Sequence, residues 1–170
     1  VRAYVHETSF GAPSGHSANA ASLWGILAVS IRKTWFSILM IVLILLIGIS
    51  RLFLGVHFMV DVVGGWLLGI CLLLLFVRFE NPVTTWFNRL VLRHQIIVII
   101  FSSMLLILPV LIIPWIYSSW QTPLEWQVNA VQPISPFNQE GSFSVAGVWV
   151  GFLSGYAWHR KRFGALKPKG

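Results

Sequence analysis

The sequence predicts an all-α membrane protein, a polytopic transmembrane bundle of about five helices. Of the 170 residues, 56% are hydrophobic and only 10% are charged, and the mean hydropathy is +0.78. Because a soluble domain usually carries about 25% charged residues, this composition indicates an integral membrane protein. The apolar residues also fall in long runs, and a helix needs about 20 mostly apolar residues to cross a bilayer.

Five apolar segments follow one another along the chain. The segments at 35–54, 58–79 and 96–117 are each long enough to span a bilayer. Those at 18–31 and 143–158 are shorter, and they reach spanning length only if flanking small or polar residues join the helix. We predict that all five are spanning helices. They would form a single membrane-embedded domain over residues 1–170, with the motifs within 8–69 and additional helices at 96–117 and 143–158.

The basic residues predict the orientation of these helices. If the five segments alternate in direction, Arg2 and Arg51 lie on one side of the membrane. The other side receives Arg32, Lys33, Arg78, Arg89, Arg93, Arg160, Lys161, Arg162, Lys167 and Lys169. By the positive-inside rule this second side is cytoplasmic. We therefore predict a multi-pass protein of the cell membrane (the plasma or inner membrane), whose polar motifs face the extracytoplasmic side. The formal charge of +7 then reflects topology, and we expect no nucleic-acid partner.

The first polar motif opens the first apolar segment. Ser14 follows Pro13 and is a favoured N-cap, so a helix is expected to begin there. The free N–H groups of a helix N-terminus attract phosphate, and Gly15 lets an anion approach the backbone closely. His16 would lie in the first turn beside that anion. In the other interpretation, Ser14 only caps the helix and His16 is an interfacial polar residue.

The second polar motif lies between the second and third apolar segments and contains the only aspartate, Asp61. His57 and Asp61 are four residues apart and are expected on one face of the third helix. A carboxylate there can fix the imidazole tautomer, which leaves the other ring nitrogen free to attack. Arg51 offers a planar set of donors for phosphate oxygens. In the other interpretation, His57 and Asp61 form a structural hydrogen bond and Arg51 reaches lipid headgroups.

Glycines four residues apart form ridges on two of the expected helices. Gly65 and Gly69 form one ridge, and Gly147, Gly151 and Gly155 form the other. Small residues at this spacing let helices approach closely. We interpret both ridges as surfaces that pack within one subunit, with dimerisation as the alternative.

The two polar motifs together resemble a known family. Pro-Ser-Gly-His at 13–16, followed by Ser50-Arg51-x5-His57-x3-Asp61, resembles the second and third signature motifs of the type 2 phosphatidic acid phosphatase superfamily. That family includes membrane lipid phosphatases, glucose-6-phosphatase-like enzymes and vanadium-dependent haloperoxidases. The resemblance covers residues 8–69.

The resemblance implies a role for each of three ionisable residues. His57 would be the nucleophile and form a phosphohistidine, and Asp61 would orient and polarise it. His16 would protonate the leaving oxygen and later activate water. The membrane lipid phosphatases of this family act on lipid phosphates. The implied function is therefore hydrolysis of a lipid phosphate monoester or diphosphate at the outer membrane face.

The resemblance also implies a phosphate-binding set that works without a metal or other cofactor. Ser14, the backbone N–H of Gly15 and Arg51 would hold the phosphoryl oxygens. The sequence fits this expectation, since it offers neither a carboxylate pair for a divalent cation nor the Cys and His spacing of a zinc site. The expected partners are the substrate, which would be a lipid phosphate or a polyprenyl diphosphate, and membrane lipids.

The chain departs from the family pattern at one point. The family's first motif is Lys-x6-Arg-Pro, upstream of the second, but this sequence has no Lys before Lys33 and only Arg2, followed by Ala3. We do not assign Arg2 to that motif, and we expect the motif and further helices to precede Val1. Two alternatives stay open. One is a non-catalytic relative that serves as a scaffold or transporter component, and the other is a haloperoxidase-like enzyme, against which the membrane composition argues.

Overall fold

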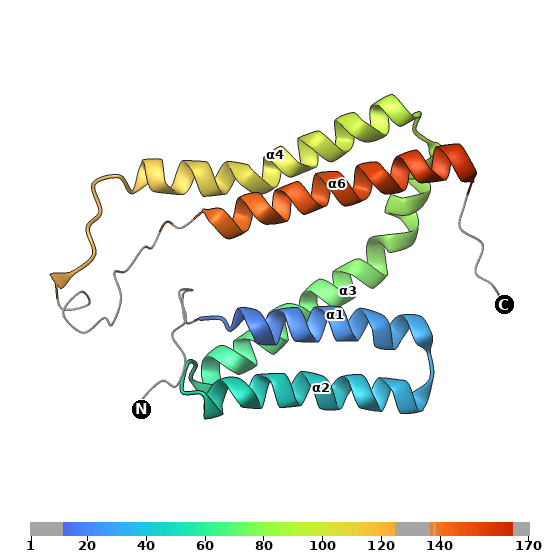
Figure 1. Ribbon diagram of the computed structural model, residues 1–170. Coiled ribbons are helices and arrows are strands. Elements are labelled where there is room, and N and C mark those ends of the chain that lie inside the picture. Colours follow the sequence, from blue (N-terminus) through green and yellow to red (C-terminus); the bar gives the residue numbers. More distant parts are fainter. Residues whose placement is uncertain (1–11, 125–136, 138, 165–170) are drawn as a thin grey trace. The chain divides into compact units, whose positions relative to one another are not determined.

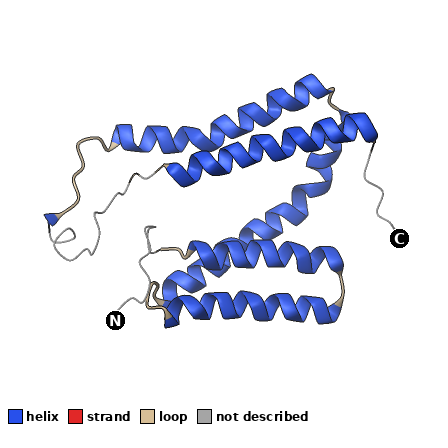
Figure 2. Ribbon diagram, in the orientation of Figure 1, coloured by secondary structure: helices blue, strands red, loops and turns tan. Residues whose placement is uncertain are grey.

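The computed structural model describes residues 12–124, 137 and 139–164. All regular secondary structure in these ranges is helical (Figure 2). The helices are α1 (Gly15–Ile31), α2 (Thr34–Phe53), α3 (Met59–Arg89), α4 (Leu92–Ile116) and α6 (Glu140–Phe163). The predicted all-α class is confirmed, and each of the five expected helices is present.

The chain falls into two compact units, Val1–Val83 and Thr84–Gly170. The assignment of residues 1–170 to a single domain stays a prediction. Three helices are long and apolar enough to cross a membrane, namely α2, α3 and α4. The expectation of five spanning helices is thus supported for three. Helix α1 has only 17 residues, and α6 contains many small, polar and basic residues.

In the first unit, α1 and α2 lie side by side and run in opposite directions (Figure 1). Helix α1 ends at Arg32, which adopts the left-handed conformation with φ 54° and whose N–H donates to the carbonyl of Ala28. Lys33 follows, and α2 begins directly after it. This tight connection leaves Arg32 and Lys33 at one end of the helix pair. Ser14 and Arg51 therefore lie at the opposite end.

Helix α3 packs closely against α1 through the first glycine ridge. A Cβ atom added to Gly65 would lie 2.5 Å from the carbonyl oxygen of Ser14 and 2.8 Å from the Cβ of Ser17. A Cβ added to Gly69 would collide with Ala18 and Ala21. The backbones approach this closely because only small residues face each other. The interpretation of this ridge as an internal packing surface is confirmed.

Helix α3 is longer than the sequence predicts. The expected segment ends at residue 79, whereas α3 continues through Pro82 to Arg89. A proline inside a helix removes the donor to the carbonyl four residues earlier, here that of Arg78. Residues 78–85 are exposed, so a polar environment can satisfy that carbonyl and the helix continues. The helix predicted from the apolar segment 58–79 therefore ends ten residues later than expected.

In the second unit, α4 and α6 run in opposite directions and are joined by side-chain hydrogen bonds. The indole N–H of Trp149 donates to the Ser102 hydroxyl at 2.9 Å. Near it, the Ser103 hydroxyl donates to the carbonyl of Ala146 at 3.5 Å. Toward the start of α6, Gln139 donates to the carbonyl of Val110 at 3.1 Å. Such polar contacts hold apolar helices together where the hydrophobic effect between them is weak.

The second glycine ridge does not pack in the described part of the chain. Cβ atoms added to Gly147, Gly151 or Gly155 would meet no described atom within 4 Å. The expectation that this ridge is a packing surface like that of α3 was therefore wrong within the unit. Ala146 and Ala157 of α6 are buried instead, and the carbonyl of Ala146 accepts from Ser103 of α4.

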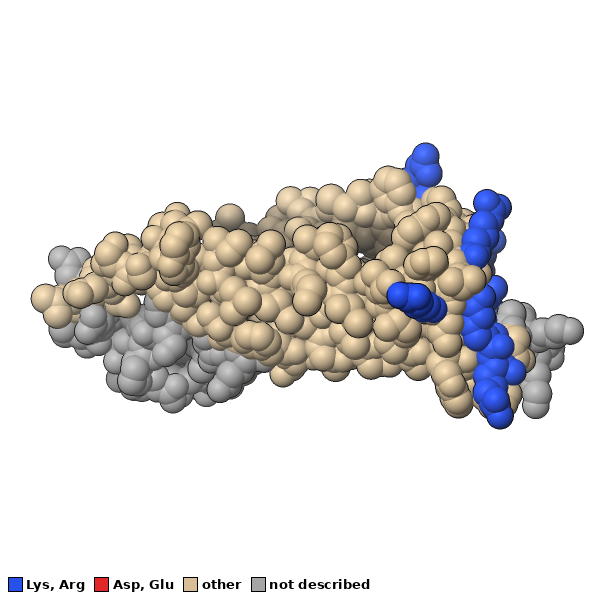
Figure 3. All heavy atoms as spheres, turned by 90° about the horizontal axis from the view of Figure 1, so that it is seen from above, with Lys and Arg blue, Asp and Glu red and all other residues tan. Residues whose placement is uncertain are grey.

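Basic side chains gather at one end of the second unit, where α6 ends and α4 begins (Figure 3). They comprise Arg89, Arg93, Arg160, Lys161 and Arg162. Because α4 and α6 are antiparallel, the end of one helix lies beside the start of the other. This arrangement brings together charges that are distant in the sequence.

Candidate active site

Ser14 is the N-cap of α1 and is completely buried. Its backbone is extended, with φ −62° and ψ 112°, as expected for a residue that precedes a helix. Its N–H donates to the backbone carbonyl of Asp61 at 2.9 Å. Its hydroxyl oxygen accepts hydrogen bonds from the N–H and the hydroxyl of Ser17, at 3.4 and 3.2 Å. The first polar motif is therefore anchored directly to the second.

Asp61 lies in the first turn of α3 and is only 8% exposed. Its Oδ2 accepts a hydrogen bond of 2.8 Å from the N–H of Phe58. Phe58 is the residue before α3, so the carboxylate reaches back to the helix start as the acidic residue of a capping box does. A negative charge is also favoured there by the helix dipole. These contacts explain how a carboxylate is accommodated in this apolar chain.

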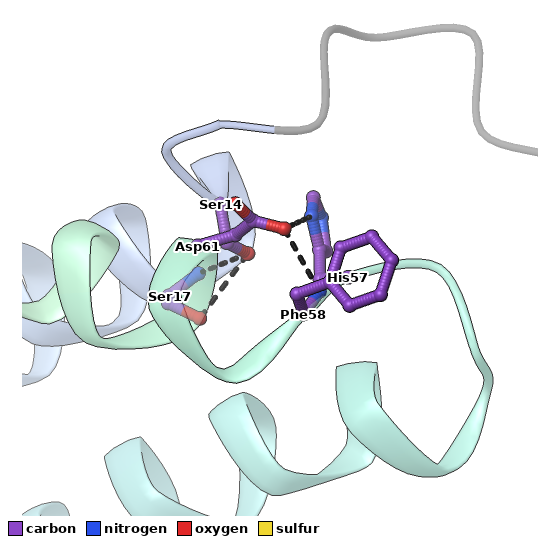
Figure 4. Close-up of polar contacts among 5 residues, drawn as sticks. All are labelled: Ser14, Ser17, His57, Phe58 and Asp61. Atoms are coloured by element: carbon purple, nitrogen blue, oxygen red, sulfur yellow. Dashed lines mark hydrogen bonds and ion pairs between the residues drawn. The ribbon is translucent and has the colours of Figure 1, made fainter.

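The same Asp61 oxygen faces His57. The Nδ1 atom of His57 lies 3.9 Å from Oδ2 of Asp61, and His57 is 8% exposed. Figure 4 shows the carboxylate turned toward both His57 and Phe58, and the Ser17 side chain turned toward Ser14. The predicted pairing of His57 with Asp61 is therefore present, with Nδ1 as the ring nitrogen on the carboxylate side.

His57 lies in the turn before α3 and not on the helix itself. The prediction that His57 and Asp61 share a helical face was wrong on this point. The turn leaves α2 through Gly55, whose φ of 69° is readily adopted only by glycine. The N–H of Gly55 donates to the carbonyl of Leu52, and that of Val56 to the carbonyl of Arg51. This turn, rather than helical spacing, carries His57 to Asp61.

Arg51 lies in the last turn of α2. Its Nε donates to the hydroxyl of Ser50 at 3.4 Å, and the Ser50 hydroxyl in turn donates to the carbonyl of Ile47 at 2.7 Å. Arg51 is half-buried. The guanidinium is thus held at the same end of the helix pair as Ser14. A guanidinium carries a planar set of donors that suits recognition of an oxyanion.

Gly15 and His16 form the exposed start of α1. A Cβ atom added to Gly15 would meet no described atom within 4 Å. No described atom therefore crowds Gly15 on that side, and the free N–H groups of a helix N-terminus attract anions. His16, in the same first turn, belongs to the same end of the unit as His57 and Asp61.

One polar residue of this site was not identified from the sequence. Ser17 is fully buried and bonds to Ser14, but neither sequence motif includes it. Its position three residues after an N-cap was the available signal. As for metals, no group of three or more His, Cys, Asp or Glu side chains that could hold an ion occurs among residues 12–124, 137 and 139–164.

Residues 2–85 match the family model described as the PAP2 superfamily. This segment is similar to the PAP2 superfamily and makes up just under half of the chain. It contains both polar motifs and α1 and α2 in full, together with most of α3. The resemblance inferred from the motifs is therefore confirmed.

Curated relatives match this chain over part of their length. Phosphatidylglycerophosphatase B of Bacillus subtilis (strain 168) is 42% identical, over 46% of this chain and 43% of the relative. Undecaprenyl-diphosphatase of Sulfolobus acidocaldarius is 36% identical, over 44% of this chain and 35% of the relative. Lipid A 4'-phosphatase of Bacteroides thetaiotaomicron is 38% identical, over 35% of this chain and 27% of the relative. The chain thus spans less than half the length of each, and no solved structure matches it.

The relatives are all named as phosphatases or diphosphatases, and three helices of this chain are apolar enough to span a membrane. The three helices indicate a membrane protein, and the chain is similar to named phosphatases over part of their length. The helices agree with the apolar composition of the whole chain.

Proposed function

We propose that the protein hydrolyses a phosphate monoester or diphosphate of a lipid through a phosphohistidine intermediate. The observation that carries this proposal is the position of Asp61. Its side chain faces His57 while its backbone carbonyl binds the N-cap Ser14. A candidate nucleophile and a candidate phosphate-binding helix end thereby share one residue.

In the first chemical step, Nε2 of His57 attacks phosphorus. A new P–N bond forms as the P–O bond to the lipid breaks, and His16 gives its proton to the departing oxygen. Asp61 lies beside Nδ1, so its charge stabilises the imidazole ring as that ring becomes positive. In the second step, His16 takes a proton from water as the water oxygen attacks phosphorus. The P–N bond breaks, releasing inorganic phosphate and restoring His57.

The phosphoryl oxygens need positive charge and hydrogen-bond donors throughout both steps. Ser14, the N–H of Gly15 and the guanidinium of Arg51 are the groups that we assign to this role. Donors held in place before the reaction stabilise developing charge without reorganisation. We infer that they act in place of a metal ion, so the reaction would not require a divalent cation.

We infer that the substrate is a lipid presented at the extracytoplasmic face. The relatives are named for phosphatidylglycerophosphate, undecaprenyl diphosphate and lipid A. These lipids differ in headgroup and tail but share a phosphate at the membrane surface. In the first unit, Arg32 and Lys33 lie at the end opposite to Ser14 and Arg51. The positive-inside rule then assigns the polar motifs to the outer side.

The experiment is a phosphate-release assay on the purified full-length protein in liposomes. Phosphatidylglycerol phosphate, phosphatidic acid and undecaprenyl diphosphate are offered separately, with and without EDTA. We expect release from at least one lipid, unchanged by EDTA and abolished in His57→Ala. Brief exposure to ³²P-labelled substrate should leave acid-labile, base-stable phosphate on the wild type only. Absence of release from all three lipids would contradict the proposed function, and full activity of His57→Ala would contradict the proposed nucleophile.

A further inference from the structure

The hydroxyl of Ser17 is buried at the start of α1 and points to Ser14. It donates to the Ser14 hydroxyl oxygen at 3.2 Å, and the Ser17 N–H donates to the same oxygen at 3.4 Å. Both residues have no exposed surface. A serine hydroxyl has two acceptor positions and a single proton to donate. Ser17 therefore fills both acceptor positions of Ser14.

The backbone of Ser14 is also fixed on both sides. Its N–H donates to the carbonyl of Asp61 at 2.9 Å, and its own carbonyl accepts from the N–H of Ala18 at 3.0 Å. The backbone N–H of Ser14 and both acceptor positions of its hydroxyl are used by these contacts among described residues, which leaves the hydroxyl proton as the donor of Ser14 that they do not use. A phosphate oxygen at the helix N-terminus requires a donor of this kind.

We propose that Ser17 is a positioning residue that commits the Ser14 hydroxyl to donate to a phosphoryl oxygen. This inference rests on the proposed function, since it assumes that a phosphate binds at the start of α1. Without the Ser17 hydroxyl, one acceptor position of Ser14 is released. Ser14 can then rotate, and its proton is no longer reserved for substrate.

Packing alone does not account for a serine at this position. Ser17 faces Gly65 of α3, where a Cβ atom added to the glycine would lie 2.8 Å from the Ser17 Cβ. A small residue is needed there, and alanine would meet that need without a polar group. Burial of a hydroxyl is unfavourable unless it is hydrogen-bonded. Ser17→Ala therefore removes the hydroxyl while keeping the Cβ that packs against α3.

The test is a double-mutant cycle on the full-length protein with a lipid phosphate that the wild type hydrolyses. The kcat/KM is measured for Ser17→Ala, Ser14→Ala and the double variant, together with the inhibition constant of inorganic phosphate. We expect Ser17→Ala to lose about three- to tenfold in kcat/KM, the size of one hydrogen bond. The double variant should be no slower than Ser14→Ala, because Ser17 acts only through Ser14. The affinity for phosphate should fall in parallel.

Ser22→Ala is the matched control. Its hydroxyl is also on α1 but donates to the carbonyl of Ala18 at 3.0 Å, within the helix. It should leave kcat/KM and phosphate inhibition unchanged, and the melting temperature of every variant is recorded. Wild-type kcat/KM in Ser17→Ala, or a loss that adds fully to that of Ser14→Ala, would overturn the proposal. Failure of the wild type to hydrolyse any lipid phosphate would instead overturn the proposed function, and this inference with it.

Discussion

The backbone N–H of Ser14 donates to the backbone carbonyl of Asp61 at 2.9 Å, which joins the two polar motifs across the whole of α2. Because this bond involves main-chain atoms only, a substitution of either side chain does not remove it directly. Side-chain variants at the site can therefore test chemistry while the motifs stay assembled.

Asp61→Asn should separate the charge of Asp61 from its structural role. The asparagine oxygen can still accept from the N–H of Phe58, a bond of 2.8 Å in the wild type, but it cannot stabilise a positively charged His57. In serine proteases the orienting carboxylate contributes about 10⁴-fold to kcat. We expect a loss of about 10²- to 10⁴-fold in kcat here, with the melting temperature near that of the wild type.

Asp61→Ala is the comparison for that variant. It removes the cap on α3 as well as the charge, and loss of a helix cap costs about 1 kcal/mol of stability. It should therefore lower both kcat and the melting temperature. A kcat for Asp61→Asn within a few-fold of the wild type would show that the carboxylate has only a structural role.

Gly65→Ala should destabilise the protein and disturb the site. The added Cβ would lie 2.5 Å from the Ser14 carbonyl oxygen, so α1 and α3 must separate. Overpacking of this kind costs about 1 to 3 kcal/mol, which outweighs the gain of up to about 1 kcal/mol from replacing a helical glycine. We expect a lower melting temperature and weaker activity, since the Ser14–Asp61 bond spans the same contact.

Gly151→Ala is the matched control on α6, where an added Cβ would meet no described atom. Its melting temperature should stay the same or rise slightly through helix propensity. A fall as large as that of Gly65→Ala would show that the α6 ridge is covered by another helix. An unchanged melting temperature in Gly65→Ala would contradict the close packing of α1 on α3.

The helices could be predicted from the sequence because each apolar run extends over many residues. The runs of apolar residues located α2 and α4 to within a few positions of their bounds. The end of α3 was missed because Pro82 and the polar residues around it resemble a loop locally. The two glycine ridges show the same limit. Gly65 and Gly69 pack against α1, whereas the glycines of α6 at the same spacing stay exposed. The spacing alone does not reveal which helix face contacts another helix.

The site was predictable in its residue types but not in its connections. The pairing of His57 with Asp61 followed from their spacing, although the turn at Gly55 produces it and helical periodicity does not. The bond between Ser14 and Asp61 could not be foreseen, because it joins backbone atoms that carry no residue identity. Ser17 was missed for a related reason, since a serine in an apolar helix becomes informative only when its partner is known.

The orientation of α4 can be tested by cysteine labelling. This helix has 25 residues, which corresponds to a length of about 37 Å and suffices to cross the hydrocarbon core. Arg89 precedes it and Gln121 follows it, and both are exposed. In a protein whose Cys71 is replaced by alanine, an impermeant thiol reagent applied to intact cells should label Gln121→Cys and not Arg89→Cys. The opposite pattern would reverse the proposed orientation and place the polar motifs inside.

The role of His16 should depend on the leaving group. A lipid alkoxide must be protonated as it departs, whereas p-nitrophenolate leaves readily without a proton. General acid catalysis contributes about 10² to 10⁴-fold. We therefore expect His16→Ala to slow phosphorylation of the enzyme by about that factor with a lipid monoester, and only weakly with p-nitrophenyl phosphate. Rapid-quench measurement of the phosphoenzyme with each substrate gives both rates.

The second step provides an independent check on the same variant. Because His16 would also activate water, His16→Ala should accumulate phosphoenzyme when p-nitrophenyl phosphate is the substrate, while His57→Ala should form none with either substrate. Ser22→Ala on the same helix, whose hydroxyl bonds within α1, should behave as the wild type. If His16→Ala slows phosphorylation equally with both substrates and traps no intermediate, His16 is a phosphate ligand or a structural residue. The leaving oxygen would then receive its proton from another group or from water.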